Sequence, residues 1–73
     1  MTLHLRKRSF RLAGHATSIA LEPAFWSALE RLAESRTMSL AQLVAEADAK
    51  RILQGVPLAS TLRLLALEAA QQR

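Results

Sequence analysis

GHATSIALEPAFW, residues 14–26, contains the pattern that decides the fold. Large apolar side chains alternate with small ones over residues 16–21, as they do in a β-strand with one buried face. The expected core face carries Thr17, Ile19 and Leu21, and the expected outward face carries Ala16, Ser18 and Ala20. Pro23 ends this strand and suits the first turn of a helix, where its missing N–H is not needed. The sequence therefore predicts a strand at about 16–21 that passes directly into a helix.

Three later segments have apolar residues at helical spacing. They predict helices over about 23–35, about 40–54 and 57–72. Ser39 and Gln42 fit a capping box, S-x-x-Q, at the start of the second helix, and Gly55 fits its end. The third helix carries Leu64 and Leu67 away from its main apolar stripe, so we expect it to have a second surface that needs a cover.

The chain is short, with 73 residues, and has no cysteine. One domain of this size buries only about 60% of its unfolded surface, and no disulfide or thiolate metal site can stabilise it, so oligomerisation is expected. A single strand would also leave a row of backbone N–H and C=O groups unpaired. The simplest remedy is a second copy, whose strand pairs antiparallel about a two-fold axis. Whether residues 9–12 add a further strand through a turn at Ala13-Gly14 stays open.

The formal net charge of +4 lies entirely in the first eleven residues. Four basic residues precede the first acid, Glu22, and the remaining six basic residues balance the six acidic ones. A basic segment on a neutral body is typical of a protein that binds a polyanion such as DNA, although a solvated tail that only aids solubility has the same composition. Residues 1–8 are therefore expected to form a mobile basic arm.

The run TSIALEPAFWSALERLAESRTMSLAQLVAEA, residues 17–47, resembles the ribbon-helix-helix (Arc/MetJ-type) family. The longer run RSFRLAGHATSIALEPAFW, residues 8–26, is similar to a group of small bacterial members, most of unassigned function. The resemblance implies a mainly α fold with one short β-strand in each chain. Two chains would form an intertwined homodimer with a two-stranded antiparallel ribbon. The ribbon-helix-helix domain would cover residues 9–54, and the C-terminal helix would pack on the dimer.

The resemblance also implies a DNA-binding site and a shared core. The outward residues Ala16, Ser18 and Ala20 would face base edges in the major groove. The amides at the start of the second helix would bind a phosphate, because a helix N-terminus carries partial positive charge. The expected phosphate-contacting residues are Arg6, Lys7, Arg8, Arg11, His15, Ser39 and Leu40. The expected dimer core comprises Ile19, Leu21, Phe25, Trp26, Leu29, Leu32, Leu40, Leu43 and Val44.

The outward strand residues depart from the family pattern, because two of the three are alanines without a donor or acceptor. Direct readout of bases would then depend on Ser18 alone. Three interpretations stay open. Specificity comes from Arg8, Arg11 and His15; or binding is mostly electrostatic and shape-based; or the ribbon no longer binds DNA and the fold serves as a dimer platform.

Two classes of function follow. The first is a homodimeric, cytoplasmic DNA-binding protein that regulates transcription. The second is a protein-interaction module, similar to ribbon-helix-helix antitoxins, that binds a partner through Leu64 and Leu67; the same helix could instead pack back on its own dimer.

The chain has no Gly-rich phosphate loop, no H-E-x-x-H and no arrangement of paired carboxylates, so we expect no enzymatic activity, cofactor or metal site. No apolar run approaches about 18 residues, so no membrane association is expected.

Overall fold

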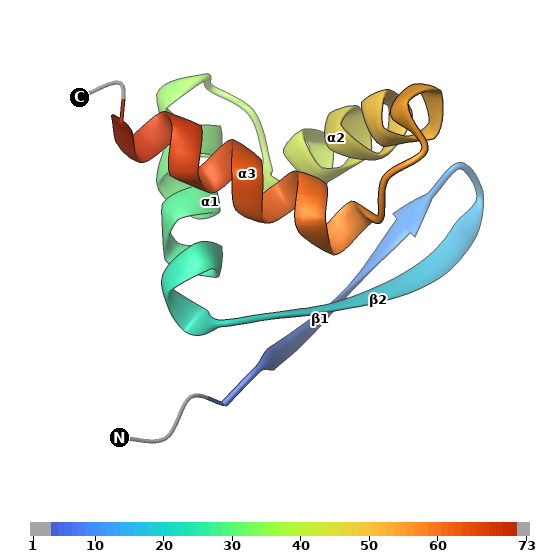
Figure 1. Cartoon of the computed structure of the whole chain (residues 1–73), viewed down its shortest axis with the longest axis horizontal. Helices are drawn as coiled ribbons and strands as arrows, with labels where there is room; N and C mark the ends of the chain where they lie inside the picture. Colours follow the sequence, from blue (N-terminus) through green and yellow to red (C-terminus); the bar gives the residue numbers. More distant parts are fainter. Residues whose placement is uncertain (1–3, 72–73) are drawn as a thin grey trace.

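The computed structural model describes residues 4–71, which form two strands followed by three helices (Figure 1). The elements are β1 (Arg6–Leu12), β2 (His15–Leu21), α1 (Pro23–Ser35), α2 (Leu40–Gln54) and α3 (Leu58–Gln71). Figure 1 shows the three helices gathered on one side of the β1–β2 hairpin. This is the two-stranded antiparallel ribbon with helices that the sequence predicted.

Both strands of this ribbon come from one chain, so the expectation of a single strand in each chain was wrong; pairing with a second copy stays a prediction. In the antiparallel register Arg6 is opposite Leu21, and Leu12 is opposite His15. Ala13 and Gly14 form a two-residue turn with φ angles of 51° and 82°. Two successive positive φ values are typical of a type I′ turn, whose twist matches that of the paired strands. This turn brings residues 6–12 back along β2, where they satisfy its backbone groups.

The predicted basic arm at residues 1–8 was also wrong for residues 6–8, which belong to β1. Their backbone groups pair with those of β2, and this pairing fixes the direction of each side chain. Residues 1–3 of the predicted arm lie outside the described residues.

The hydrophobic core is closed within a single chain. Six members of the expected dimer core are buried here, and the other three, Phe25, Leu32 and Leu40, are partly buried against them. Helix α3 supplies further buried side chains, Leu58, Leu62 and Ala66, and it packs against α1, α2 and β2 of its own chain. Helix α3 therefore contributes to the core of its own chain, and a core shared with a second copy stays a prediction.

The helices begin and end at recognisable signals. Ser39 and Gln42 form the complete capping box at the start of α2, and Gly55 ends this helix with a φ of 69°. Among the described residues, no single helix is long and apolar enough to cross a membrane; α2 and α3 meet that criterion only together, as a pair bent by 115°.

Helix α1 ends with a residue in the left-handed conformation that is not glycine. The amide of Met38 donates to the carbonyl of Ala33 and the amide of Thr37 donates to that of Glu34, both at 3.0 Å, which is the Schellman pattern. Thr37 has a φ of 55°, where a β-branched side chain is strained.

Replacing Thr37 with glycine is expected to raise the free energy of unfolding by about 0.5–1 kcal/mol, because glycine adopts this conformation without steric cost. Denaturant unfolding followed by circular dichroism measures the change. Thr61→Gly, the same substitution inside α3, should instead lower stability by a similar amount. A loss of stability in Thr37→Gly would contradict the assigned strain.

Candidate nucleic-acid interface

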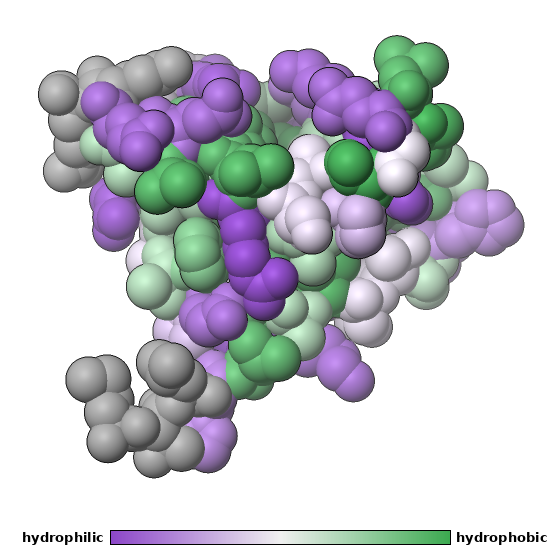
Figure 2. All heavy atoms as spheres, viewed as in Figure 1, coloured by the Kyte–Doolittle hydropathy of each residue, from purple (hydrophilic) through white to green (hydrophobic). Residues whose placement is uncertain are grey.

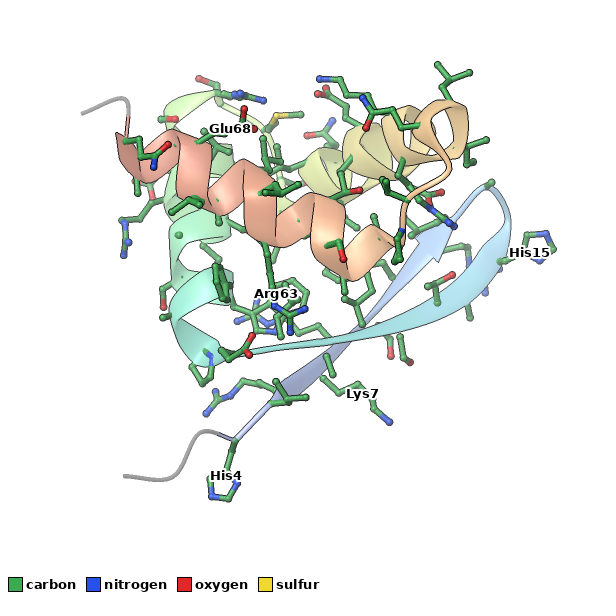
Figure 3. All side chains as sticks on the ribbon, viewed as in Figure 1. His4, Lys7, His15, Arg63 and Glu68 are labelled. Carbon is green, nitrogen blue, oxygen red and sulfur yellow. The ribbon has the colours of Figure 1, made fainter. Side chains whose placement is uncertain are left out.

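The hairpin has an exposed face that points away from the helices. Side chains alternate along each strand, so one face of the hairpin collects every second residue. This outer ribbon face comprises Lys7, Ser9 and Arg11 from β1 and Ala16, Ser18 and Ala20 from β2. The cross-strand pairs are Lys7–Ala20, Ser9–Ser18 and Arg11–Ala16. All six are exposed except Ala20, which is half-buried, and Figure 3 shows Lys7 pointing away from the helices.

The outer ribbon face places two cations on either side of a pair of hydroxyl groups. The Oγ atoms of Ser9 and Ser18 lie 2.9 Å apart and share a hydrogen bond. Arg11 donates through Nη1 to the carbonyl of Gly14 at 3.4 Å, which is a long and weak bond. Within the described part of the chain, neither Lys7 nor Arg11 forms an ion pair with a carboxylate. The face is therefore positively charged and rich in hydrogen-bond donors.

Arg8, which was expected to contact phosphate, lies on the opposite face of the hairpin. Its Nη2 atom is 3.3 Å from Oε1 of Glu30, and its guanidinium carbon is 5.2 Å from the centroid of the Trp26 ring. Trp26 also donates through Nε1 to the carbonyl of Arg6 at 2.7 Å, and its ring lies 5.9 Å from that of Phe10. Arg8 and Trp26 thus attach β1 to α1, and Arg8 does not reach the outer ribbon face.

The remaining predicted phosphate contacts lie in three separate places. Arg6 is exposed at the start of β1. His15 is exposed beside the turn (Figure 3). Ser39 and Leu40 begin α2, where the amide of Ser39 already donates to Oε1 of Gln42 at 2.8 Å. Among the described residues, no hydrogen bond or ion pair joins this helix start to the ribbon. Within one chain the structure therefore brings Lys7, Arg11 and Ser18 together, but not the amides of α2.

Sequence reasoning missed Ser9, and it missed that Lys7 and Arg11 share one face with Ser18. The signal was present in the segment SFRL, because Phe10 and Leu12 alternate with Ser9 and Arg11. The sequence left open whether residues 9–12 form a strand; the structure shows that they do, and this places Ser9 and Arg11 outward.

An ion pair joins α3 to the junction between β2 and α1. Nη2 and Nε of Arg63 lie 3.0 and 3.1 Å from Oε1 of Glu22, and the guanidinium carbon lies 5.8 Å from the centroid of the Phe25 ring. Figure 3 shows Arg63 extending from α3 toward this junction. A backbone hydrogen bond at Glu22 and the hydrogen bond from Arg63 lower the pKa of the Glu22 carboxyl from its ordinary value of 4.5.

This pairing predicts a pH dependence of stability. Because the folded-state pKa of Glu22 is lowered, its contribution is present above pH 4.5 and is lost as the pH falls through the folded-state pKa. Glu22→Gln should therefore be less stable than the parent protein at pH 7, and the difference should shrink at about pH 3. Urea unfolding at both pH values measures it. Glu46→Gln, an exposed carboxylate in α2, is the control; a Glu22→Gln deficit that is equally large at pH 3 would contradict the assignment.

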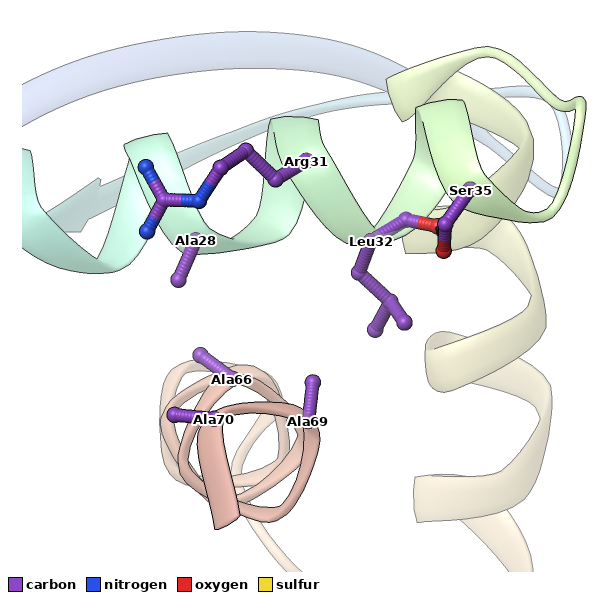
Figure 4. Close-up of a pocket in the computed structure, with 7 residues that line it drawn as sticks. All are labelled: Ala28, Arg31, Leu32, Ser35, Ala66, Ala69 and Ala70. Atoms are coloured by element: carbon purple, nitrogen blue, oxygen red, sulfur yellow. Dashed lines mark hydrogen bonds between the residues drawn. The ribbon is translucent and has the colours of Figure 1, made fainter. Parts of the chain in front are cut away.

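Two grooves lie away from the ribbon, both against α3. The groove between α1 and α3, of about 370 Å³, is lined mostly by alanine, and Ser35 at its edge donates to the carbonyl of Leu32 at 2.7 Å (Figure 4). The groove between α2 and α3, of about 320 Å³, is lined in part by Leu64.

In the part of the chain that the structure describes, no three His, Asp or Glu side chains lie close enough together to hold a metal ion.

Exposed apolar side chains gather at the end of α2 and along α3 (Figure 2). Leu53 is 89% exposed and Ile52 62%, while Leu64 and Leu67 are 59% and 50% exposed. The two leucines that the sequence placed off the main stripe of the third helix are thus not covered by the rest of this chain.

The chain has recognisable similarity to known proteins. A family model described as a ribbon-helix-helix domain matches residues 5–70. Among solved structures, an uncharacterized protein from Bordetella pertussis Tohama I is 36% identical, with a TM-score of 0.76; the match covers 86% of this chain and 53% of that one. The present chain therefore spans about half the length of this relative. No curated protein matches the sequence.

Proposed function

Since the chain belongs to the ribbon-helix-helix family, we propose that it is a homodimeric DNA-binding protein that regulates transcription. Members of the family are generally DNA-binding regulators. The observation that carries the proposal is the outer ribbon face, which is exposed, two-stranded and positively charged. A two-stranded ribbon fits the width of the major groove, and cations near phosphates release counterions and so favour binding.

The position of the cations supports DNA binding over a merely solubilising tail. Lys7 and Arg11 are held by a paired strand on one face, together with two serine hydroxyls, whereas a solubilising tail needs no such order. Arg6, His15 and the first amides of α2 are proposed to contact phosphates at the margins of this docked ribbon. Alternatively, cations on a short exposed sheet also discourage strand-to-strand aggregation. Binding measurements separate the two roles.

The homodimer is part of the proposal. The chain has 73 residues and no cysteine, and small domains without disulfides often gain stability by oligomerisation. Sedimentation equilibrium should give twice the chain mass of 8.1 kDa at micromolar concentrations. A well-folded species of single-chain mass would remove the dimer from the proposal and leave the DNA-binding face to be tested separately.

The proposal is tested by titrating the protein with random-sequence duplex DNA at two salt concentrations. Affinity should fall steeply as salt rises, and amide NMR shifts should concentrate on the outer ribbon face and at Leu40. Shifts confined to α3, or binding that does not respond to salt, would contradict a groove-docked ribbon.

A second candidate function is protein interaction through α3, which the exposure of Leu64 and Leu67 favours. Leu64→Lys should fold normally, with a change of about 0.5 kcal/mol or less in stability, because the side chain is largely exposed. It should also lose co-purification with a protein encoded by a neighbouring reading frame. Leu53→Lys, the same change at an exposed site on α2, should retain it. Unchanged co-purification in Leu64→Lys would exclude this role.

A further inference from the structure

We infer that Lys7 and Arg11 of β1 determine the DNA sequence that the protein prefers, and that each contacts a guanine. The inference rests on the proposed function, because it takes the outer ribbon face as the surface that enters the major groove. It assigns base recognition to β1, whereas the family resemblance implied base contacts from β2. It also names the base that each residue contacts.

Apart from Lys7 and Arg11, the side chains of the outer ribbon face have little capacity to distinguish one base from another. Ala16 and Ala20 have neither donor nor acceptor, so at most they contact a thymine methyl group. Ser9 and Ser18 are hydrogen-bonded to each other at 2.9 Å, and either atom can be the donor. One hydroxyl hydrogen and several oxygen lone pairs of this serine pair remain free to bond to DNA. The pair can therefore bond to a donor or to an acceptor on a base edge. It therefore discriminates weakly between bases.

Lys7 and Arg11 are different because they present several donors and no acceptor. Guanine presents two adjacent acceptors, O6 and N7, in the major groove, and Arg or Lys paired to them is the commonest specific contact. Arg11 uses one N–H in a bond of 3.4 Å to Gly14, and the rest of its guanidinium remains available. The residues opposite Lys7 and Arg11 are both alanine, so no larger side chain on the partner strand covers either cation.

The neighbouring cations do not share this role. Arg8 is on the inner face, paired with Glu30 and stacked on Trp26. Arg6 is two residues from Arg8, so the two side chains leave β1 on the same, inner face, and that of Lys7 leaves on the other. Alternation along β1 thus selects two of the four cations.

The strand geometry also sets the spacing of the two guanines. Lys7 and Arg11 are four residues apart, which corresponds to about 13 Å along a strand. Successive base pairs rise about 3.4 Å along the helix axis, and the path along the groove is somewhat longer. A ribbon that follows the groove therefore places the two side chains about three to four base pairs apart.

The test is selection of preferred duplexes from a random library with the full chain, followed by affinity measurement on the selected sequence and on versions with each guanine replaced. In each half-site we expect two guanine positions separated by three to four base pairs, each worth about 5- to 150-fold in affinity. Arg11→Gln should lose the preference at one position and Lys7→Gln at the other.

Arg11→Lys should keep affinity for random duplex but weaken the preference at the Arg11 position, because lysine keeps the charge but lacks the planar guanidinium that makes bidentate hydrogen bonds. Arg31→Gln, which removes an exposed cation from α1, is the control and should change neither preference.

The outcomes separate the inference from the proposed function. Guanine preferences that survive both Lys7→Gln and Arg11→Gln would overturn the inference and leave DNA binding intact. Binding of all duplexes with equal affinity would overturn it in the same way. Failure to bind any duplex at low salt would instead refute the proposed function itself. Circular dichroism confirms that each variant is folded before its binding is compared.

Discussion

Replacing Trp26 with alanine is expected to lower the free energy of unfolding by about 3–5 kcal/mol. The side chain is 1% exposed and is among the largest fully buried groups of the chain. Its removal leaves a cavity beneath the ribbon and leaves the carbonyl of Arg6 without the indole N–H that it accepts at 2.7 Å. It also removes the ring on which Arg8 stacks and against which Phe10 packs. Because a domain of this length has a total stability of about 4–11 kcal/mol, this loss is a large fraction of the total.

Denaturant unfolding measures this effect, and two variants help to assign it. Trp26→Phe keeps most of the buried volume but loses the hydrogen bond, so we expect a smaller loss, of about 1–3 kcal/mol. Leu53→Ala removes an exposed apolar side chain and should change stability by about 0.5 kcal/mol or less. If Trp26→Ala were as stable as Leu53→Ala, the attachment of β1 to α1 through this side chain would be refuted.

The double variant Lys7→Gln/Arg11→Gln is expected to bind random-sequence duplex DNA about 10- to 100-fold more weakly at about 0.1 M salt. On random-sequence duplex, where the preferred guanines are not in place, each of these cations is expected to neutralise a phosphate; each such contact adds about 0.9 to the slope of log affinity against log salt, so the slope should fall by about 2. Both side chains are exposed and without a carboxylate partner in the described residues, so the fold should not change. Fluorescence anisotropy at several salt concentrations gives both quantities.

The matched control is Arg31→Gln/Lys50→Gln, which removes the same net charge from exposed positions on α1 and α2. It should leave the slope nearly unchanged. Equal losses in the two double variants would show that net charge, and not the outer ribbon face, governs binding. Substitution is preferable to deletion of residues 1–8, because deletion would also remove backbone pairing from β1.

The sequence by itself determined the elements whose signals are local. The alternation up to Leu21, Pro23 at the start of α1 and the Ser39–Gln42 capping box each depend on residues within a few positions of one another. Such periodic and capping patterns act through short-range geometry, so they could be read without knowing the neighbours in space. The same patterns carried the family resemblance, and with it the ribbon and its outward residues on β2.

Only the tertiary structure decided which segment pairs with β2, and this pairing fixed the directions of the four predicted phosphate contacts on β1. Three of the four cations in the first eleven residues were assigned to a mobile arm at residues 1–8, and the turn has Ala13 where Asn-Gly is the strongest hairpin signal. Strand pairing is a competition between segments that are distant in sequence or in separate molecules, and no local pattern records its outcome. Once β1 is paired, alternation sends Arg8 to Trp26 and Glu30 and sends Lys7 and Arg11 outward. The identity of each residue was visible in the sequence, but its direction depended on a partner strand that only the folded chain provides.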